Sequence, residues 1–426
     1  MVIERYKDQD MERIWDNKCY KYAMWREVES AIIQAQVELG NFPNKTVLEL
    51  QHVSIDNKFV ERVEELEQET RHDMIAFIKA LEEHMQDSSY LHRGLTSSDV
   101  KDTANMVRIQ ESLGFLRAWM IHLQEQLGAY ATRWADVYTL GRTHGMPAEP
   151  TTWGLRLHQW RMELKRHIKR LQDVRQRAGV GMFSGTVGTY TGLSLHAEKR
   201  ACEILGLRPA EGTSQIISRD IHAEMIMVLA GLASSIEKWA TEIRNLQRAE
   251  IGEVQEQFTK NQQGSSAMPH KKNPMKCERL CGLARLVRAN VVPALENVAT
   301  WHDRDLTQSS TERVIIPDSF HLVSYMLKQF INVLDHLKVN EERMFENLDK
   351  AGHVYSSRLL IYLMEQGLDR SEAYEIVQEA TQGRGSMEGR IKSACGLRGI
   401  AIDFEEVCTI KGMLSAIQEV MRKEGS

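Results

Sequence analysis

Three stretches of the chain place apolar residues at alternating steps of three and four positions. The first runs from Leu113 to Trp134, the second from Met225 to Leu246 and the third from Phe320 to Leu337. Because this spacing buries a narrow seam between nearly parallel helices, it predicts long helices packed in a bundle. Extended Val- and Ile-rich alternation is scarce, so we expect an all-α fold with little sheet.

The regions on either side of these stretches predict shorter helices. Trp15, Tyr22, Trp25, Val28 and Ile32 lie at helical spacing and predict one buried helical face near the start of the chain. We therefore expect three helical domains, over residues 1–95, 96–348 and 349–426, of which the second is the long-helix bundle. Long helices with apolar stripes on more than one side favour association with further copies of the chain.

Polar segments rich in Gly, Pro or Ser separate the predicted helices, and such loops on a rigid scaffold often hold functional residues. A further loop over His92–Asp99 precedes the first long helix, and either Ser98 or Asp99 is expected to cap that helix. The other predicted loops are Gly141–Pro150, Gly179–Gly192, Gly206–Asp220, Gly264–Pro274 and Trp301–Pro317.

Composition narrows the class of protein. The 426 residues include 42% hydrophobic and 27% charged residues, with a net charge of -5, which is typical of a globular protein and argues against nucleic-acid binding. No apolar run is long enough to span a membrane, and the first residues lack the apolar core of a signal peptide. The six cysteines are scattered without the spacing of a disulfide framework, so we expect a cytoplasmic protein. Cys277 and Cys281 lie four positions apart, but buried free thiols explain them better than a zinc site.

The segment Gly264–Pro274, Gly-Ser-Ser-Ala-Met-Pro-His-Lys-Lys-Asn-Pro, concentrates reactive side chains between two helical patterns. Its glycine and two prolines disfavour a continuous helix. A solvated linker is one interpretation of such a segment. The combination of two hydroxyls, an imidazole, two ammonium groups and a carboxamide also suits a catalytic loop.

Histidines occur in three other loops or helix junctions, at His72, His92 and His144. His144 lies in Gly-Arg-Thr-His-Gly, a tight turn in which an imidazole can be held as an acid or base. The pair His72-Asp73 also permits another interpretation, a metal-dependent phosphohydrolase, for which His52 and His84 are the only nearby candidate ligands. Both of these histidines lie in ordinary amphipathic sequence, which argues against that interpretation.

Basic and hydroxyl side chains gather in the same loops of an otherwise acidic chain. Such donors suit a polyanionic ligand. No glycine-rich phosphate loop or dinucleotide motif is found, so any phosphate belongs to a substrate, and we expect no cofactor. The residues are Arg5, Arg71, Lys271, Lys272, Arg304 and Arg313, with Thr96, Ser97, Ser309 and Ser310.

The segment Gly264–Pro274 closely resembles the signature loop of the fumarase/aspartase superfamily. Further motifs resemble the adenylosuccinate lyase family, and they follow the family order over about residues 1 to 380. These motifs are Arg5-Tyr6, Thr70–Asp73, Gly94–Asp99, Gly141–Gly145, and His302–Asp305 through Ser309–Arg313.

The resemblance implies an all-α homotetramer whose active sites are each built by three subunits. It implies a small succinyl-purine nucleotide substrate, with fumarate eliminated from adenylosuccinate to leave AMP, and from the succinyl-aminoimidazole carboxamide ribotide. Neither a metal nor a cofactor is implied, and no nucleic acid or membrane partner.

The resemblance also assigns roles residue by residue. Ser265 matches the general base, His144 the general acid, and Glu278 the carboxylate that orients that histidine. The residues that match the family's phosphate and nucleotide contacts are Arg5, Tyr6, Arg71, Thr96, Ser97, Ser309 and Arg313. Contacts to the succinyl group or base, with their supports, match Lys271, Asn273, Gln215, Arg304, His72, Asp73 and His92.

Two alternatives remain open. A sister lyase or cycloisomerase acting on argininosuccinate, aspartate or a carboxymuconate shares the Gly-Ser-Ser-x-Met-Pro motif. Arg5-Tyr6 and Arg71–Asp73 argue against it, since a small diacid would not need phosphate and purine contacts. A non-catalytic structural protein on a lyase scaffold is the other alternative, and the intact Ser265, His144, Lys271 and Glu278 argue against it.

Overall fold

A computed structural model of the chain describes residues 2–258, 267–268, 270–382 and 386–422. The fold is all-α with a few short strands, as predicted. The chain divides into two compact units, each built from segments distant in sequence. The first unit comprises residues 1–121, 166–238 and 279–331, and the second comprises residues 122–165, 239–278 and 332–426. The division into three domains at residues 95 and 348 stays a prediction.

The first unit begins with short helices that pack through aromatic side chains. Asp8, Asn17 and Asp56 cap three of these helices with their side chains. Tyr22 and Phe77 stack with their ring centroids 5.7 Å apart, and Trp25 packs edge-to-face with Phe77 at 5.3 Å. The elements are η1 Glu4–Tyr6, α1 Gln9–Trp15, α2 Lys18–Glu38, α3 Asn44–His52, α4 Asn57–Thr70 and α5 Asp73–Glu82.

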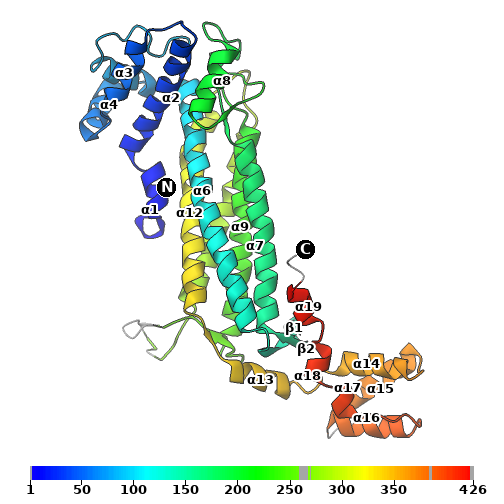
Figure 1. The fold of residues 1–426 in the computed structure, drawn as a ribbon. Helices are drawn as coiled ribbons and strands as arrows, with labels where there is room; N and C mark the ends of the chain where they lie inside the picture. The colour runs from blue at the N-terminus through cyan, green and yellow to red at the C-terminus, as the bar shows by residue number, and fades with distance from the viewer. Residues whose placement is uncertain (1, 259–266, 269, 383–385, 423–426) are drawn as a thin grey trace. The chain divides into compact units, whose positions relative to one another are not determined.

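The long helices form where the heptad-like seams predicted them. Most seam residues, including Leu113, Met225 and Phe320, are fully or almost fully buried. In the first unit, α6, α9 and α12 run side by side (Figure 1). The long helices and their neighbours are α6 Ser97–Arg133, α7 Trp153–Arg177, α8 Leu195–Ile204, α9 Arg219–Leu246, α10 Met275–Ala289, α11 Val291–Glu296 and α12 Thr307–Asp335.

Two local predictions about these helices are wrong. The predicted loop Trp301–Pro317 ends early, because α12 begins at Thr307 and continues through Pro317. Buried Ile315, Ile316 and Phe320 hold this part of the helix in the core, so packing outweighs the proline's missing N–H. The cap of α6 is also misplaced, since the helix begins at Ser97 and the carboxylate of Asp99 reaches back to the backbone N–H of Thr96, 2.7 Å away.

The predicted loop Gly141–Pro150 is a β-hairpin. Strand β1, Tyr138–Thr143, pairs antiparallel with β2, Met146–Thr152, and their register shifts between Leu140 and Arg142. The connecting residues His144 and Gly145 have φ of 55° and 78°, as in the two-residue turns whose twist suits a hairpin. Gly141 has no Cβ, which would lie 2.7 Å from the carbonyl oxygen of Glu149 on the other strand.

The second unit also contains a small helical core near the C-terminal end of the chain. Leu359, Leu363, Ile391 and Cys395 are fully buried there. The helices from residue 341 onwards are α13 Glu341–Lys350, α14 Ser356–Glu365, α15 Arg370–Gln382, α16 Met387–Gly396, α17 Phe404–Val407, α18 Ile410–Met413 and α19 Ile417–Arg422. The remaining strands pair as β3 Val180–Gly181 with β4 Arg208–Pro209, and β5 Val254–Gln255 with β6 Lys338–Val339.

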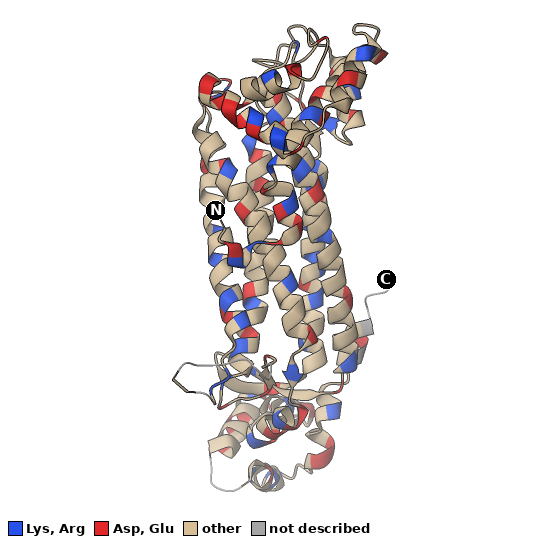
Figure 2. Cartoon of the chain, turned by 90° about the vertical axis from the view of Figure 1, so that its left-hand side faces the viewer, with Lys and Arg blue, Asp and Glu red and all other residues tan. Residues whose placement is uncertain are grey.

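Acidic and basic residues are interspersed along the helices of both units (Figure 2). Within the described part of the chain, no helix is long and apolar enough to cross a membrane.

Candidate active site

The first unit gathers many of the predicted ligand-binding residues around Asp73. The Asp73 carboxylate makes an ion pair with Lys101 and lies 3.4 Å from the guanidinium of Arg313 on α12. The imidazole of His72, the residue that caps α5, lies 3.8 Å from the same carboxylate. Burial alone would raise the pKa of Asp73, but the charges of Lys101, Lys21 and Arg313 lower it below its ordinary value. The carboxylate is therefore held in its charged form by several cations.

Two lysines of this cluster were not found from the sequence. Lys21 lies 4.6 Å from the ring centroid of Trp25, and Lys101 lies 5.6 Å from the same ring. Burial lowers the pKa of Lys21 to about 8, and the pKa of Lys101 also falls below its ordinary value through burial. Each sits in ordinary helical sequence, so only the folded chain reveals that they meet Asp73. With Arg313 they give the cluster an excess of positive charge, which suits an anionic ligand.

His92 is held at the loop before α6. Its Nδ1 lies 2.6 Å from a carboxylate oxygen of Glu29, a fully buried residue of α2, and its backbone N–H donates to the other oxygen. Burial lowers the pKa of His92, but the hydrogen bond and charge of Glu29 outweigh this and raise it above its ordinary value. Glu29 thus fixes both the backbone and the ring of His92.

Thr96 and Ser97 lie at the start of α6, where Asp99 organises the backbone. Besides the N–H of Thr96, the Asp99 carboxylate accepts from the N–H groups of Ser184 and Gly185, at 3.0 and 3.3 Å. Burial raises the pKa of Asp99 to about 6, although the backbone donors oppose this. Asp99 therefore ties the turn with the two predicted hydroxyls to the loop that follows β3.

Gln215 and Arg304, two of the predicted substrate contacts, are hydrogen-bonded to each other. The side-chain oxygen of Gln215 accepts a hydrogen bond from Arg304 at 2.9 Å, and its nitrogen donates to the carbonyl of Thr186. The same loop is anchored by Arg219, whose buried guanidinium binds Asp102 on α6 and Glu312 on α12. Glu312 immediately precedes Arg313, so this buried network also fixes the helix that carries Arg313 and Ser309.

Arg5 and Tyr6 lie on η1, which is tied to α12. The backbone N–H groups of Val2 and Asp8 donate to Asp318 and His321, at 2.8 and 3.1 Å. The ring of Tyr6 meets the edge of Tyr325 at 5.6 Å. Arg71 is left-handed, with φ of 54°, and ends α4, where its side chain is exposed.

Of the residues predicted to take part in the reaction, His72 belongs to the first unit, and His144, Lys271 and Glu278 belong to the second. His144 occupies the tip of the β1–β2 hairpin, Lys271 precedes α10, and Glu278 lies in the first turn of α10. All three side chains are exposed, and among the described residues no hydrogen bond joins His144 to Glu278. Asn273 lies between Lys271 and α10 and is partly buried. Ser265, the predicted base, lies outside the described residues.

The metal-site alternatives find no support in the described part of the chain, where no group of three or more potential metal ligands comes together. In the described part of the chain, the His52 imidazole is hydrogen-bonded to the carbonyl of Leu48, one turn earlier in its own helix. The side chains of Cys277 and Cys281 are buried, as predicted.

Known proteins are similar to this chain over most of its length, both in sequence and in structure. The family model described as "Lyase" matches residues 12–289. An adenylosuccinate lyase of Aquifex aeolicus is 43% identical over 380 residues, which cover 88% of this chain and 87% of that protein. An adenylosuccinate lyase of Synechocystis sp. is 44% identical over 391 residues, covering 91% and 90%. The structure also resembles a 3-carboxy-cis,cis-muconate lactonizing enzyme from Pseudomonas putida, with 27% identity, a TM-score of 0.79, and coverage of 92% and 89%.

Proposed function

This chain belongs to the adenylosuccinate lyase family, and we propose that it eliminates fumarate from adenylosuccinate to leave AMP, and from the succinyl-aminoimidazole carboxamide ribotide. The observation that carries this function is the likeness to adenylosuccinate lyases along most of the chain. The excess of cations around Asp73 supports it, because a nucleotide phosphate and a succinyl group are both anionic.

The reaction breaks a C–H bond and a C–N bond of the substrate and forms the double bond of fumarate. In the proposal, Ser265 removes the proton from the carbon next to a carboxylate, and His144 gives a proton to the departing amine nitrogen. The intermediate carries two negative charges at that carboxylate. Lys271 and Asn273 offer the donors that stabilise such charge, which is worth most where they are already in place.

The first unit supplies the binding groups in this proposal. Arg71, Arg313, Thr96 and Ser97 contact the phosphate and nucleotide, together with Arg5, Tyr6 and Ser309. His72, Asp73, His92, Gln215 and Arg304 contact or support the succinyl group and base. Only protons and electron pairs already present in the substrate and side chains move, so a metal or cofactor has no part in the proposal.

We further propose a homotetramer with composite active sites. Apolar side chains are exposed on α10, on α11 and immediately before α12, including Leu286, Val292 and Leu306 at 52%, 58% and 67% exposure. Exposed apolar surface of this kind favours burial against another copy of the chain. Exposed His144, Lys271 and Glu278 are compatible with sites completed by neighbouring chains. The free cysteines favour the cytoplasm as its location.

The test is incubation of the purified protein with adenylosuccinate, argininosuccinate and aspartate separately, with fumarate measured by its absorbance. Fumarate and AMP should form from adenylosuccinate, at a rate that EDTA does not change. Turnover of argininosuccinate without turnover of adenylosuccinate would contradict the proposal and favour a sister lyase.

A further inference from the structure

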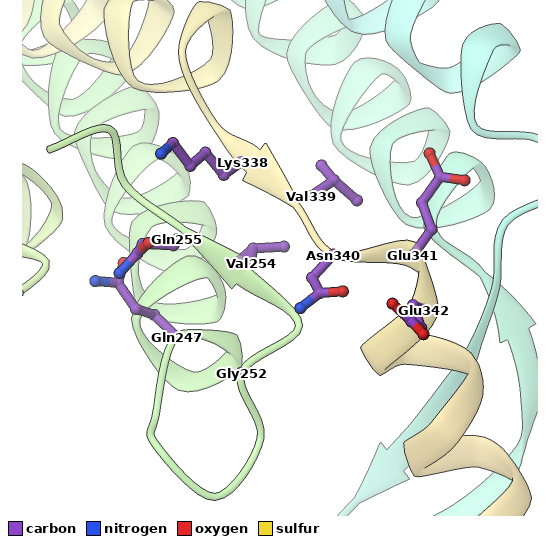
Figure 3. A pocket seen from close by; sticks show the side chains of 9 residues that line it. All are labelled: Gln247, Gly252, Val254, Gln255, Lys338, Val339, Asn340, Glu341 and Glu342. Carbon is purple, nitrogen blue, oxygen red and sulfur yellow. The ribbon is translucent and has the colours of Figure 1, made fainter.

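The segment Gln247–Glu256, which follows α9, contacts each element that carries a predicted reaction residue in the second unit. Gln247 donates to the carbonyl of Lys272 at 3.1 Å and accepts from the N–H of Glu256 at 2.9 Å. The buried carboxylate of Glu256 accepts from the N–H groups of Lys276 and Cys277 at the start of α10, the helix that carries Glu278. Gln247, Val254 and Gln255 of this segment, together with Lys338, also line a pocket of about 550 Å³. Their side chains are drawn in Figure 3.

Glu253 makes the strongest of these contacts, and its partner is in the hairpin of His144. The guanidinium of Arg142 donates to both oxygens of the Glu253 carboxylate, at 2.5 and 3.1 Å. Thr139 donates to one oxygen at 3.2 Å and Asn347 of α13 to the other at 2.8 Å. Glu253 is fully buried, whereas the Arg142 side chain is 20% exposed. A bidentate pair between such groups has a defined geometry as well as a favourable energy.

The tip of the hairpin has few other restraints. Thr143, His144, Gly145 and Met146 are all exposed, and the described residues provide no hydrogen bond to the His144 side chain. Arg142 lies on β1, two positions before His144, which is the first residue of the turn. The Arg142–Glu253 pair is therefore the charged contact that joins the base of this tip to the buried part of the second unit.

We propose that the Arg142–Glu253 pair is a positioning device for His144, and that Arg142 and Glu253 act on the elimination through that imidazole. The inference rests on the proposed function, in which His144 is the general acid. A general acid must lie within hydrogen-bond distance of the atom it protonates, and an error of about 1 Å can cost on the order of a hundredfold in rate. A pair two residues away on a short hairpin controls that distance.

The experiment is a double-mutant cycle between Arg142→Lys and His144→Ala in the full-length protein. Arg142→Lys keeps the charge but loses the two-pronged contact. It should lower kcat for adenylosuccinate by roughly tenfold or more, with KM changed by less than about threefold. In the His144→Ala protein the same change should cost less than about twofold, because the group being positioned is gone. Equal fold losses in both backgrounds would overturn the inference.

Two further variants separate positioning from folding. Glu253→Gln keeps the shape of the side chain and removes its charge, so it should reproduce the non-additive loss. Arg343→Lys is the matched control, since Arg343 of α13 donates to the carbonyls of Ile251 and Glu250 in the same segment and, among the described residues, has no hydrogen bond to the hairpin. It should leave kcat within about twofold of the native value. An equal loss in Arg343→Lys, or failure of both Arg142→Lys and Glu253→Gln to fold, would show a structural role and overturn the inference.

The proposed function is checked separately by the unmodified protein. If it releases no fumarate from adenylosuccinate, the function fails before the cycle begins. If the unmodified protein is active and His144→Ala is equally active, the function stands and the positioning inference fails.

Discussion

In the first unit, Asp73, His92, Gln215 and Arg304 each make a hydrogen bond or ion pair with another described residue, and Glu29, the partner of His92, is fully buried. In the second unit, His144, Lys271 and Glu278 are exposed on a hairpin tip, a connecting segment and a helix end. The residues assigned to binding are thus organised within one chain. The residues assigned to proton transfer and charge stabilisation depend on the backbone elements that carry them, and in our proposal on neighbouring chains.

This difference shows which groups a single chain can hold in position before a ligand binds. Several cations share the carboxylate of Asp73, so an anionic ligand meets charges that are already held in place. A proton-transfer group has to face the reacting atoms instead, and hydrogen bonds that occupied its polar atoms would compete with the substrate. We therefore expect substitutions in the second unit to lower kcat and substitutions in the first unit to raise KM.

The largest effect is expected for the predicted base. Ser265→Ala removes one hydroxyl oxygen, and loss of a general base costs about 10²–10⁴ in rate, so kcat should fall at least a hundredfold. Melting temperature and substrate affinity should stay close to native, since the substitution removes a single hydroxyl and leaves Lys271, Asn273 and the assigned phosphate contacts unchanged. Steady-state kinetics with Ser266→Ala as the matched control checks this, and the control should lose clearly less activity. If Ser265→Ala keeps more than about a tenth of native kcat, another residue is the base.

A smaller effect, on KM and not on kcat, is expected for Asp73→Asn. The amide cannot neutralise Lys21, Lys101 and Arg313, so the cluster should lose its arrangement. Loss of a charged hydrogen-bond partner is worth about 1.5–3 kcal/mol, which corresponds to a rise in KM of roughly ten- to a hundredfold. The measurement is kcat and KM for adenylosuccinate, beside Glu61→Gln, an exposed control on α4. A fall in kcat at native KM would contradict the prediction that substitutions in the first unit act on substrate binding.

The smallest effect is a pH dependence of stability from His92 and Glu29. The pKa of His92 is raised above its ordinary value of 6.5, so the protonated ring stabilises the folded chain below about pH 6.5. That contribution is lost as pH rises through the raised pKa. Native protein should therefore exceed Glu29→Gln in melting temperature by more at pH 6 than at pH 8. Glu27→Gln on the same helix should show a constant difference, and an equally constant difference for Glu29→Gln would show that no proton is involved.

The sequence predicted the long helices well and the site unevenly, for physical reasons. Leu113, Met225 and Phe320 lie on seams whose period follows directly from helix geometry. The hairpin of His144 was missed because Pro147 and Pro150 weaken the strand pattern, and because only its turn is encoded locally. The predicted loop extended to Pro317 because proline disfavours a helix. In the structure, burial of neighbouring residues in α12 outweighs that local preference.

Long-range pairs could not be predicted from spacing at all. Lys21 and Asp73 are 52 positions apart in the printed sequence, and Arg142 and Glu253 are 111 positions apart. Each residue taken alone is an ordinary charged side chain on a helix, strand or loop. Gln215 and Arg304 were assigned together only through the resemblance, and their hydrogen bond across 89 positions is a property of the folded chain.

The most direct test of the account is complementation between two inactive variants. His144→Ala and Ser265→Ala proteins are mixed under conditions in which subunits exchange, and fumarate release is compared with each variant alone and with a mixture that has not exchanged. If different chains supply the two residues, about one site in four of the mixed tetramers contains both native residues, and activity should return to that extent. If exchange occurs and activity stays at the sum of the two variants, one chain supplies both residues and the composite site is wrong.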